Sequence, residues 1–278
     1  MTTSTPNSQR NLWLFFLLAY AFSWIFWIPE ALAANGFSLP SGLKDFLASP
    51  FNLAAFGPFL AALVLTLVND GWKGVGTLLK RGLDARFKKT WLLAILFLPL
   101  LIFAGAILLS IRLGATPLDL SVLSNPPYFT VAFVVILLTA GPLQEEFGWR
   151  GYALPRLQTR FNALTSGLIL GVFWWLWHLP LVFISGKFMT DSLPLFFFLL
   201  IEIALMSVLF VWIYNNTGGS LLASMLFHAA MNWSIWIVLP SMKVNATIVG
   251  ITVLLLAIAV SIVVYVWGPK RLSHAENK

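Results

Sequence analysis

Two adjacent carboxylates and a nearby arginine stand in the stretch Gln144-Glu145-Glu146-Phe147-Gly148-Trp149-Arg150. Charged residues make up only 10% of the chain, and ten residues in all are acidic. An ionisable group within an apolar run of a membrane protein is costly to bury, so it indicates a functional site by default. A carboxylate there can remove a proton from water and so act as a general base. The stretch therefore predicts acid–base chemistry, provided that other segments bring partners to it.

Helical spacing separates the two carboxylates. Glu146 and Arg150 are four residues apart on one helix face, so an ion pair between them lowers the cost of burying both charges. Glu145 points about 100° away round the helix and has no basic residue three or four positions along. We expect Glu146 and Arg150 to organise the site and Glu145 to carry out its chemistry. The alternative is a structural ion pair, with Glu145 reaching the membrane surface.

Two of the three histidines and one asparagine also lie inside apolar segments. His178 follows a run of tryptophans, and alone it would be interpreted as a histidine bonded within the core. His228 and Asn232 are four residues apart among alanines, a pattern that alone predicts a hydrogen bond between packed helices. Glu202 has no polar neighbour at helical spacing and is assigned a structural role, and His274 in the tail is assigned none.

Together these groups form the set that a hydrolytic site needs. A carboxylate can deprotonate water, and a histidine can assist it. Two histidines and a glutamate can instead bind a metal ion that activates water, and an asparagine can donate to an oxyanion. Because the groups come from three separate segments, the fold must bring them together.

The composition identifies the elements that must position these residues. Hydrophobic residues make up 59% of the chain, and the mean hydropathy is +0.88. The apolar stretches are continuous and lack two-residue alternation, which favours helices over a β-barrel. We predict an all-α fold, a polytopic transmembrane bundle of about eight helices. The absence of cysteine excludes a thiolate site, and without a basic patch among exposed aromatic residues we expect no nucleic-acid partner.

Eight apolar segments are each close to the roughly 20 residues that span a hydrocarbon core. They form a single transmembrane domain over 12–268, with the motifs in 128–239, between a disordered cytoplasmic tail over 1–11 and a cytoplasmic tail over 269–278. We expect a basic, partly amphipathic linker over 69–90. The expected spans are 12–33, 51–68, 91–113, 128–154, 163–184, 193–214, 220–239 and 246–268.

Lys and Arg are divided unequally between the two ends of these segments. Thirteen of the 17 fall on the side that holds both termini, and four fall on the other. The positive-inside rule therefore predicts a multi-pass protein with both termini in the cytoplasm. The first segment ends in Ala31-Leu32-Ala33, which resembles a signal-peptidase site, so cleavage there is the alternative to a retained first helix.

The segment ends place Glu145 toward the cytoplasm and His178 toward the opposite surface. These two side chains meet only if the helices shift in depth. We favour a long, tilted fourth segment that continues to about residue 154. The alternatives are a later start of the fifth segment, or helix breaks at Pro142 and Pro180.

Three short motifs, in order along the chain, resemble the CAAX prenyl endopeptidase type II and bacteriocin-processing family of intramembrane proteases, also called CPBP or Abi. The family signature is Glu-Glu-x-x-x-Arg, then Phe-x-x-x-His, then His-x-x-x-Asn. In the second motif Trp174 stands four residues before His178, with Phe173 one residue off, so an aromatic side chain is kept. The matching residues are Glu145, Glu146 and Arg150, then His178, then His228 and Asn232.

The resemblance implies an intramembrane endopeptidase that hydrolyses a peptide bond of a membrane-associated or lipidated peptide or protein in the lipid bilayer. Glu145 and His178 would activate the water. Glu146 and Arg150 would organise the site, and His228 and Asn232 would support the oxyanion or a metal. The short loops favour a prokaryotic member in the plasma membrane.

The sequence does not decide whether the protein uses a metal cofactor. If a metal is used, the resemblance makes Glu145, His178 and His228 its ligands and Zn2+ the candidate. The chain lacks the His-Glu-x-x-His helix of zincins, and a metal-free Glu/His mechanism is physically reasonable.

Two other classes of function would use the same buried groups. One is a transporter, although carriers usually show inverted repeats, whereas here the ionisable residues cluster in the fourth to seventh segments. The other is a non-catalytic membrane immunity or scaffold protein. Cleavage of a peptide by the purified protein separates the protease from both.

Overall fold

The computed structural model describes residues 6–49, 53–114, 124–186, 192–235 and 245–274. Within these ranges the chain forms helices and no strand, which confirms the all-α prediction. The elements are α1 (Pro6–Ala34), α2 (Ser41–Ala48), η1 (Ala54–Phe56), α3 (Gly57–Arg81), α4 (Trp91–Arg112), α5 (Pro126–Thr139), α6 (Pro142–Gly148), the π-helix η3 (Trp149–Ala153), α7 (Leu154–Gln158), α8 (Ala163–Trp177), η4 (Leu179–Phe183), α9 (Leu193–Asn216), α10 (Leu221–Trp233) and α11 (Ala246–Trp267).

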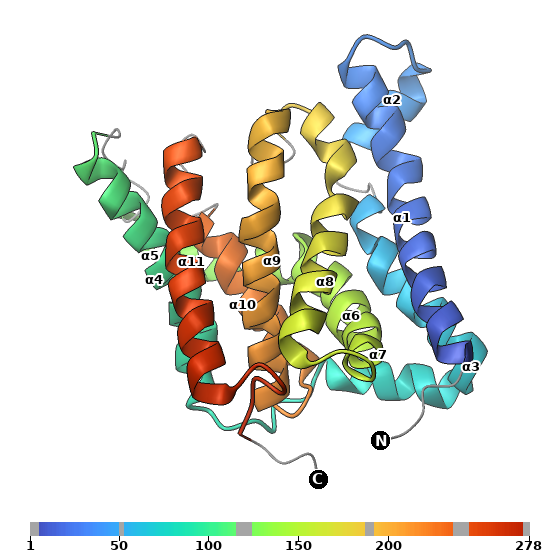
Figure 1. Ribbon diagram of the computed structural model, residues 1–278. Coiled ribbons are helices and arrows are strands. Elements are labelled where there is room, and N and C mark those ends of the chain that lie inside the picture. The colour runs from blue at the N-terminus through green and yellow to red at the C-terminus, as the bar shows by residue number, and fades with distance from the viewer. Residues whose placement is uncertain (1–5, 50–52, 115–123, 187–191, 236–244, 275–278) are drawn as a thin grey trace.

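Six helices in the described part of the chain are long and apolar enough to cross a membrane: α1, α3 with η1, α4, α8 with η4, α9 and α11. They stand side by side in a bundle (Figure 1). Helix α5 and the helical path over 142–158 are apolar enough for a seventh span only if the two are counted together, and they are bent by 41° at the break between them. The expected span 220–239 is represented by α10, whose 13 residues are short for a crossing. The protein is therefore a multi-pass membrane protein.

Helix α3 corrects the expected linker over 69–90. The helix does not end near residue 68 but continues to Arg81 after a kink at Gly71, where φ is +64° and ψ is −169°. Glycine adopts this conformation at little steric cost. The second half of α3 turns across the lower end of the bundle (Figure 1). Gly57 and Pro58 are the first two residues of the helix.

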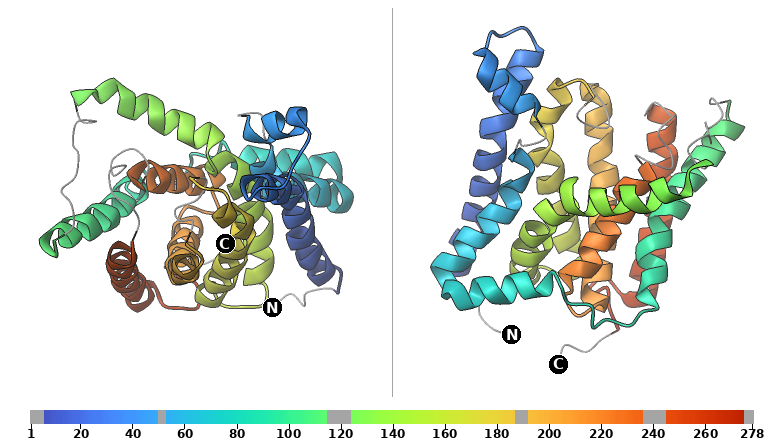
Figure 2. Two further views of the ribbon diagram at one scale, coloured as in Figure 1. Left: turned by 90° about the horizontal axis from the view of Figure 1, so that it is seen from above. Right: turned by 180° about the vertical axis from the view of Figure 1, so that it is seen from behind.

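The fourth segment is broken rather than continuous. Gly141 has φ +106°, and Pro142 begins α6 directly after it. Gln144 holds the break, because its Oε1 accepts from Gly141 N at 2.6 Å and its Nε2 donates to Thr139 O at 2.8 Å. The helical path then reaches residue 158, somewhat beyond the expected 154. Figure 2 shows α5 and α6 running across the spanning helices rather than along them.

Helix α1 fixes the end of α8 that carries His178. Trp24 Nε1 donates to Trp177 O at 2.9 Å, and Trp177 Nε1 donates to Ser23 Oγ at 2.8 Å. Tyr20 Oη also donates to Phe173 O. Such bonds hold helices together where no water competes for the donors.

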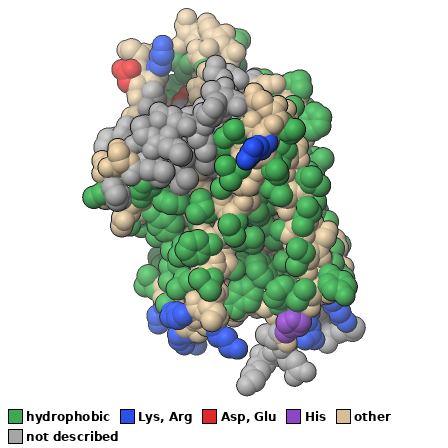
Figure 3. All heavy atoms as spheres, turned by 90° about the vertical axis from the view of Figure 1, so that its left-hand side faces the viewer, with side chains coloured by type: hydrophobic (Ala, Val, Ile, Leu, Met, Phe, Trp, Pro, Cys, Tyr) green, Lys and Arg blue, Asp and Glu red, His purple; other side chains and the backbone are tan. Residues whose placement is uncertain are grey.

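The outer surface matches a bilayer environment. Figure 3 shows a broad belt of hydrophobic side chains, with Lys and Arg gathered at the lower end of the molecule. Helix α1 begins and α11 ends at this same end (Figure 1). This distribution fits the positive-inside pattern, while the cytoplasmic assignment of that end stays a prediction.

Candidate active site

Glu146 connects the first motif to the third. Its Oε1 accepts from Arg150 Nη1 at 2.8 Å and contacts His228 Nδ1 at 2.8 Å. All three side chains are buried, and Glu146 and Arg150 are fully inaccessible. Arg150 lies in the π-helix η3, a rare irregularity that often marks a functional site. The predicted Glu146–Arg150 pair is therefore formed, and it also holds α10 in place.

Aromatic faces cover the rest of the Arg150 guanidinium. Its Cζ lies 3.8 Å from the ring centre of Phe210 and 4.6 Å from that of Trp174. Its Nε and Nη2 have no hydrogen-bond partner in the described residues. Cation–π contacts stabilise a cation that water cannot reach.

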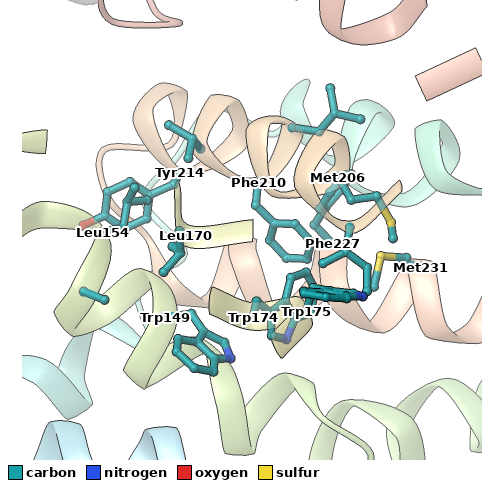
Figure 4. Packing of buried hydrophobic residues seen from close by; sticks show 14 of the residues in the cluster. Trp149, Leu154, Leu170, Trp174, Trp175, Met206, Phe210, Tyr214, Phe227 and Met231 are labelled. Carbon is teal, nitrogen blue, oxygen red and sulfur yellow. The ribbon is translucent and has the colours of Figure 1, made fainter. Parts of the chain in front are cut away.

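Glu145 points away from this pair, as its helical position predicts. Its Oε2 accepts from Trp174 Nε1 at 2.6 Å and from Trp149 Nε1 at 3.2 Å. Figure 4 shows these two indoles close together within the buried aromatic cluster. The side chain of Glu145 is 5% exposed and has no cationic partner among the described ion pairs.

The second oxygen of Glu145 faces a point beside Gly141. A Cβ atom built on Gly141 would lie 2.9 Å from Glu145 Oε1, 3.2 Å from His228 Nε2 and 3.4 Å from Asn232 Nδ2. Asn232 Nδ2 also donates to Ala140 O at 2.9 Å. Three predicted residues from α6 and α10 thus converge on the helix break. We missed Gly141 in the sequence, although Gly141-Pro142 immediately before the acidic pair could have marked it.

His178 caps the end of α8. Its Nδ1 lies 2.8 Å from Trp174 O, and because a carbonyl only accepts, Nδ1 carries the proton and donates. Nε2 is then the basic atom of the neutral ring. The ring of Trp174 lies 6.1 Å from that of His178 and 5.3 Å from that of His228. Trp174 was named in the sequence only as the aromatic residue of the second motif, but it contacts both histidines, Glu145 and Arg150.

The remaining ionisable candidates do not join this cluster. Glu202 on α9 is 1% exposed, and its Oε1 has no hydrogen-bond partner in the described part of the chain. His274 lies beside Trp267, with ring centres 5.5 Å apart.

The donor set does not form a metal centre. No group of three His, Asp or Glu side chains in the described ranges could hold a metal ion. His228 Nδ1 is engaged by Glu146, and His178 Nδ1 by a carbonyl. The ligand set Glu145, His178 and His228 stays a sequence-based prediction, and no step below passes through a metal.

Comparison with known proteins identifies the relatives of this chain. Residues 126–234 match the family described as type II CAAX prenyl endopeptidase, Rce1-like. Over these residues the chain is similar to this family. The match over 126–234 includes the six predicted site residues and lies close to the expected motif region, 128–239.

Two similar proteins match most of the length of this chain. CAAX prenyl protease 2 of Methanococcus maripaludis is 27% identical over 234 residues, which span 81% of this chain and 83% of the relative. Lysostaphin resistance protein A of Staphylococcus haemolyticus is 26% identical over 283 residues, which span 96% of this chain and 70% of the relative. The matched family and the first of these relatives are both described as CAAX prenyl proteases.

Proposed function

We propose that the protein is an intramembrane endopeptidase in which Glu145 is the general base. The observation that carries this proposal is the convergence of Glu145 Oε1, His228 Nε2 and Asn232 Nδ2 beside Gly141. A carboxylate acceptor and an amide donor around one point are what the attack of water on a carbonyl requires.

Glu145 removes a proton from water, and the oxygen forms a bond to the carbonyl carbon of the substrate. His178 Nε2 accepts a hydrogen bond from the same water and orients it. The carbonyl electrons move to oxygen, where Asn232 stabilises the negative charge. One Nδ2 hydrogen of Asn232 is used by Ala140 O, which leaves the second for this oxyanion. The carbon–nitrogen bond then breaks, and Glu145 returns its proton to the leaving amine.

Glu146 and Arg150 hold other side chains of the site in position and do not react with the substrate. The pair occupies the side of α6 away from Glu145 and fixes His228 through Nδ1. With one arginine beside two carboxylates, Glu145 has no cation of its own to neutralise it. This arrangement keeps Glu145 available to accept a proton.

The substrate in this proposal is a peptide with a lipid-modified C-terminal segment. The support is the family description and the name of the relative CAAX prenyl protease 2, together with a site built within membrane helices. The termini face the cytoplasm of a prokaryotic cell, because Lys and Arg gather where α1 begins and α11 ends (Figure 3).

The purified protein in liposomes tests this function. A fluorescent peptide ending in a prenylated cysteine and three further residues should be cleaved after the cysteine, and the same peptide without the lipid should be cleaved more slowly. Glu145→Ala and His178→Ala proteins should insert into the membrane but leave the peptide intact. Full cleavage by the Glu145→Ala protein would overturn the proposal and favour a non-catalytic membrane role.

A further inference from the structure

A charged cleft lies beside the η3 segment, and Glu145 is not among the residues that line it. Its volume is about 390 Å³. It lies where α3, η3 and α7 meet. Three cations, Lys73, Arg81 and Arg156, and one acid, Asp70, line it.

Two of the cations are held in fixed positions. Arg81 donates to Gly151 O at 3.1 Å and to Gly219 O at 3.1 Å. The Arg156 guanidinium lies 3.5 Å from the ring centre of Tyr152, and its Nη1 donates to Tyr152 O at 2.9 Å. Neither arginine forms an ion pair among those described. A fixed guanidinium loses little freedom when it binds an anion.

The cleft lies beside a helix half that carries both basic and apolar side chains. Beyond Gly71, α3 turns across the end of the bundle where Lys and Arg gather (Figures 1 and 3). This half of the helix carries exposed apolar side chains beside its lysines: Trp72 is 78% exposed and Leu79 is 40% exposed. Apolar and basic side chains on one surface helix are typical of a helix that lies in the membrane interface.

We propose that this cleft binds the phosphate group of an anionic membrane lipid. Three cations against one acid leave a positive site. Arg81 Nε and Nη2 already donate to Gly219 O and Tyr214 Oη, so Arg81 contributes its charge, while Arg156 and Lys73 supply the donors for the phosphate. The volume is in the range of small-ligand sites. Soluble phosphate offers the same chemistry, but the interfacial position of α3 presents the cleft to lipid headgroups. The proposal is independent of peptide cleavage, because the residues that line the cleft are not those proposed to act on the peptide.

Native mass spectrometry of the protein, after exchange into an equimolar mixture of phosphatidylglycerol and phosphatidylcholine, tests the site. The wild type should retain phosphatidylglycerol preferentially. Lys73→Gln/Arg156→Gln should reduce this preference by about tenfold, because it removes two charged hydrogen-bond donors from the lining of the cleft. Asp70→Asn should increase it. Lys88→Gln/Lys89→Gln removes the same charge from exposed positions outside the cleft and should leave it unchanged.

A second experiment distinguishes a lipid headgroup from soluble phosphate as the ligand. Inorganic phosphate at millimolar concentration should not displace the lipid or raise the melting temperature of the delipidated protein. If it does both, the ligand is soluble phosphate and the lipid assignment is wrong. Equal retention of the two lipids by the wild type, or equal losses in the two double variants, would overturn the site. Lys73→Gln alone, at an exposed position, serves if the double variant does not fold.

Discussion

Trp174 Nε1 on α8 donates a 2.6 Å hydrogen bond to Oε2 of Glu145 on α6. Trp174 occupies the position where the resembling signature has phenylalanine, four residues before His178. Phenylalanine would keep the ring but not the donor. In this chain the second motif is therefore tied to the first by a bond that the signature residue cannot make.

Replacing Trp174 with phenylalanine should lower kcat more than it changes KM. The variant keeps an aromatic face toward Arg150 but loses one hydrogen bond to a carboxylate, which typically contributes about 1.5–3 kcal/mol. Single-turnover cleavage should slow roughly 10- to 100-fold by this estimate. Trp175→Phe is the control, because Trp175 Nε1 donates to Phe196 O, outside the site. Equal rates for the two variants would show that the bond does not position Glu145.

Gly141→Ala should abolish cleavage. The added Cβ would lie 2.9 Å from Glu145 Oε1, and φ at Gly141 is +106°. Backbone strain of this kind costs about 1–3 kcal/mol on its own, so it needs a separate control. Gly186→Ala provides it, since Gly186 has φ +75° and no atom within 4 Å of the built Cβ. Comparable activity in the two variants would mean that the space beside Gly141 is not used.

Arg150→Gln should destabilise the protein by about 3–5 kcal/mol, because it leaves the buried charge of Glu146 without its arginine partner and in contact with His228 Nδ1. The double variant Glu146→Gln/Arg150→Gln should recover part of the melting temperature and none of the activity. Arg86→Gln, at the exposed pair with Asp84, should leave the melting temperature unchanged. If the double variant melts as low as Arg150→Gln, the uncompensated charge is not the cause.

Gly148→Ala should prevent α6 from packing on α3. A Cβ at Gly148 would lie 2.5 Å from the backbone oxygen of Pro58, which cannot move aside as a flexible side chain can. We expect a lower melting temperature and less folded protein in the membrane. Gly250→Ala in α11, with open space around the built Cβ, should behave as wild type. A stable Gly148→Ala protein would show that the two helices tolerate a wider spacing.

Local spacing predicted the parts of the site that lie within one helix. Glu146 and Arg150 are four residues apart and form the expected pair, which leaves Glu145 on another face. Continuous apolar runs likewise predicted the spanning helices. These features depend on helical periodicity, which the sequence carries directly.

The contacts between different helices could not be predicted from helical periodicity. The bond between Glu146 and His228 joins residues 82 positions apart, and its partner atoms are set by how α6 packs on α10. The prediction that the fourth segment is one continuous helix was wrong. A positive φ at Gly141 and the cap from Gln144 break the helix there, a result of tertiary packing that a hydropathy pattern does not contain.

We propose that cleavage requires the carboxylate of Glu145 in particular, and that another buried carboxylate in the bundle cannot replace it. The most direct measurement is the single-turnover cleavage rate of the lipid-modified peptide by Glu145→Gln and Glu202→Gln proteins in liposomes. Both variants neutralise a buried carboxylate of the same size, but Glu202 lies outside the cluster. We predict a loss of about 10²- to 10⁴-fold for Glu145→Gln, the usual contribution of a general base, and a near-wild-type rate for Glu202→Gln. A Glu145→Gln protein that cleaves as fast as Glu202→Gln would contradict the account.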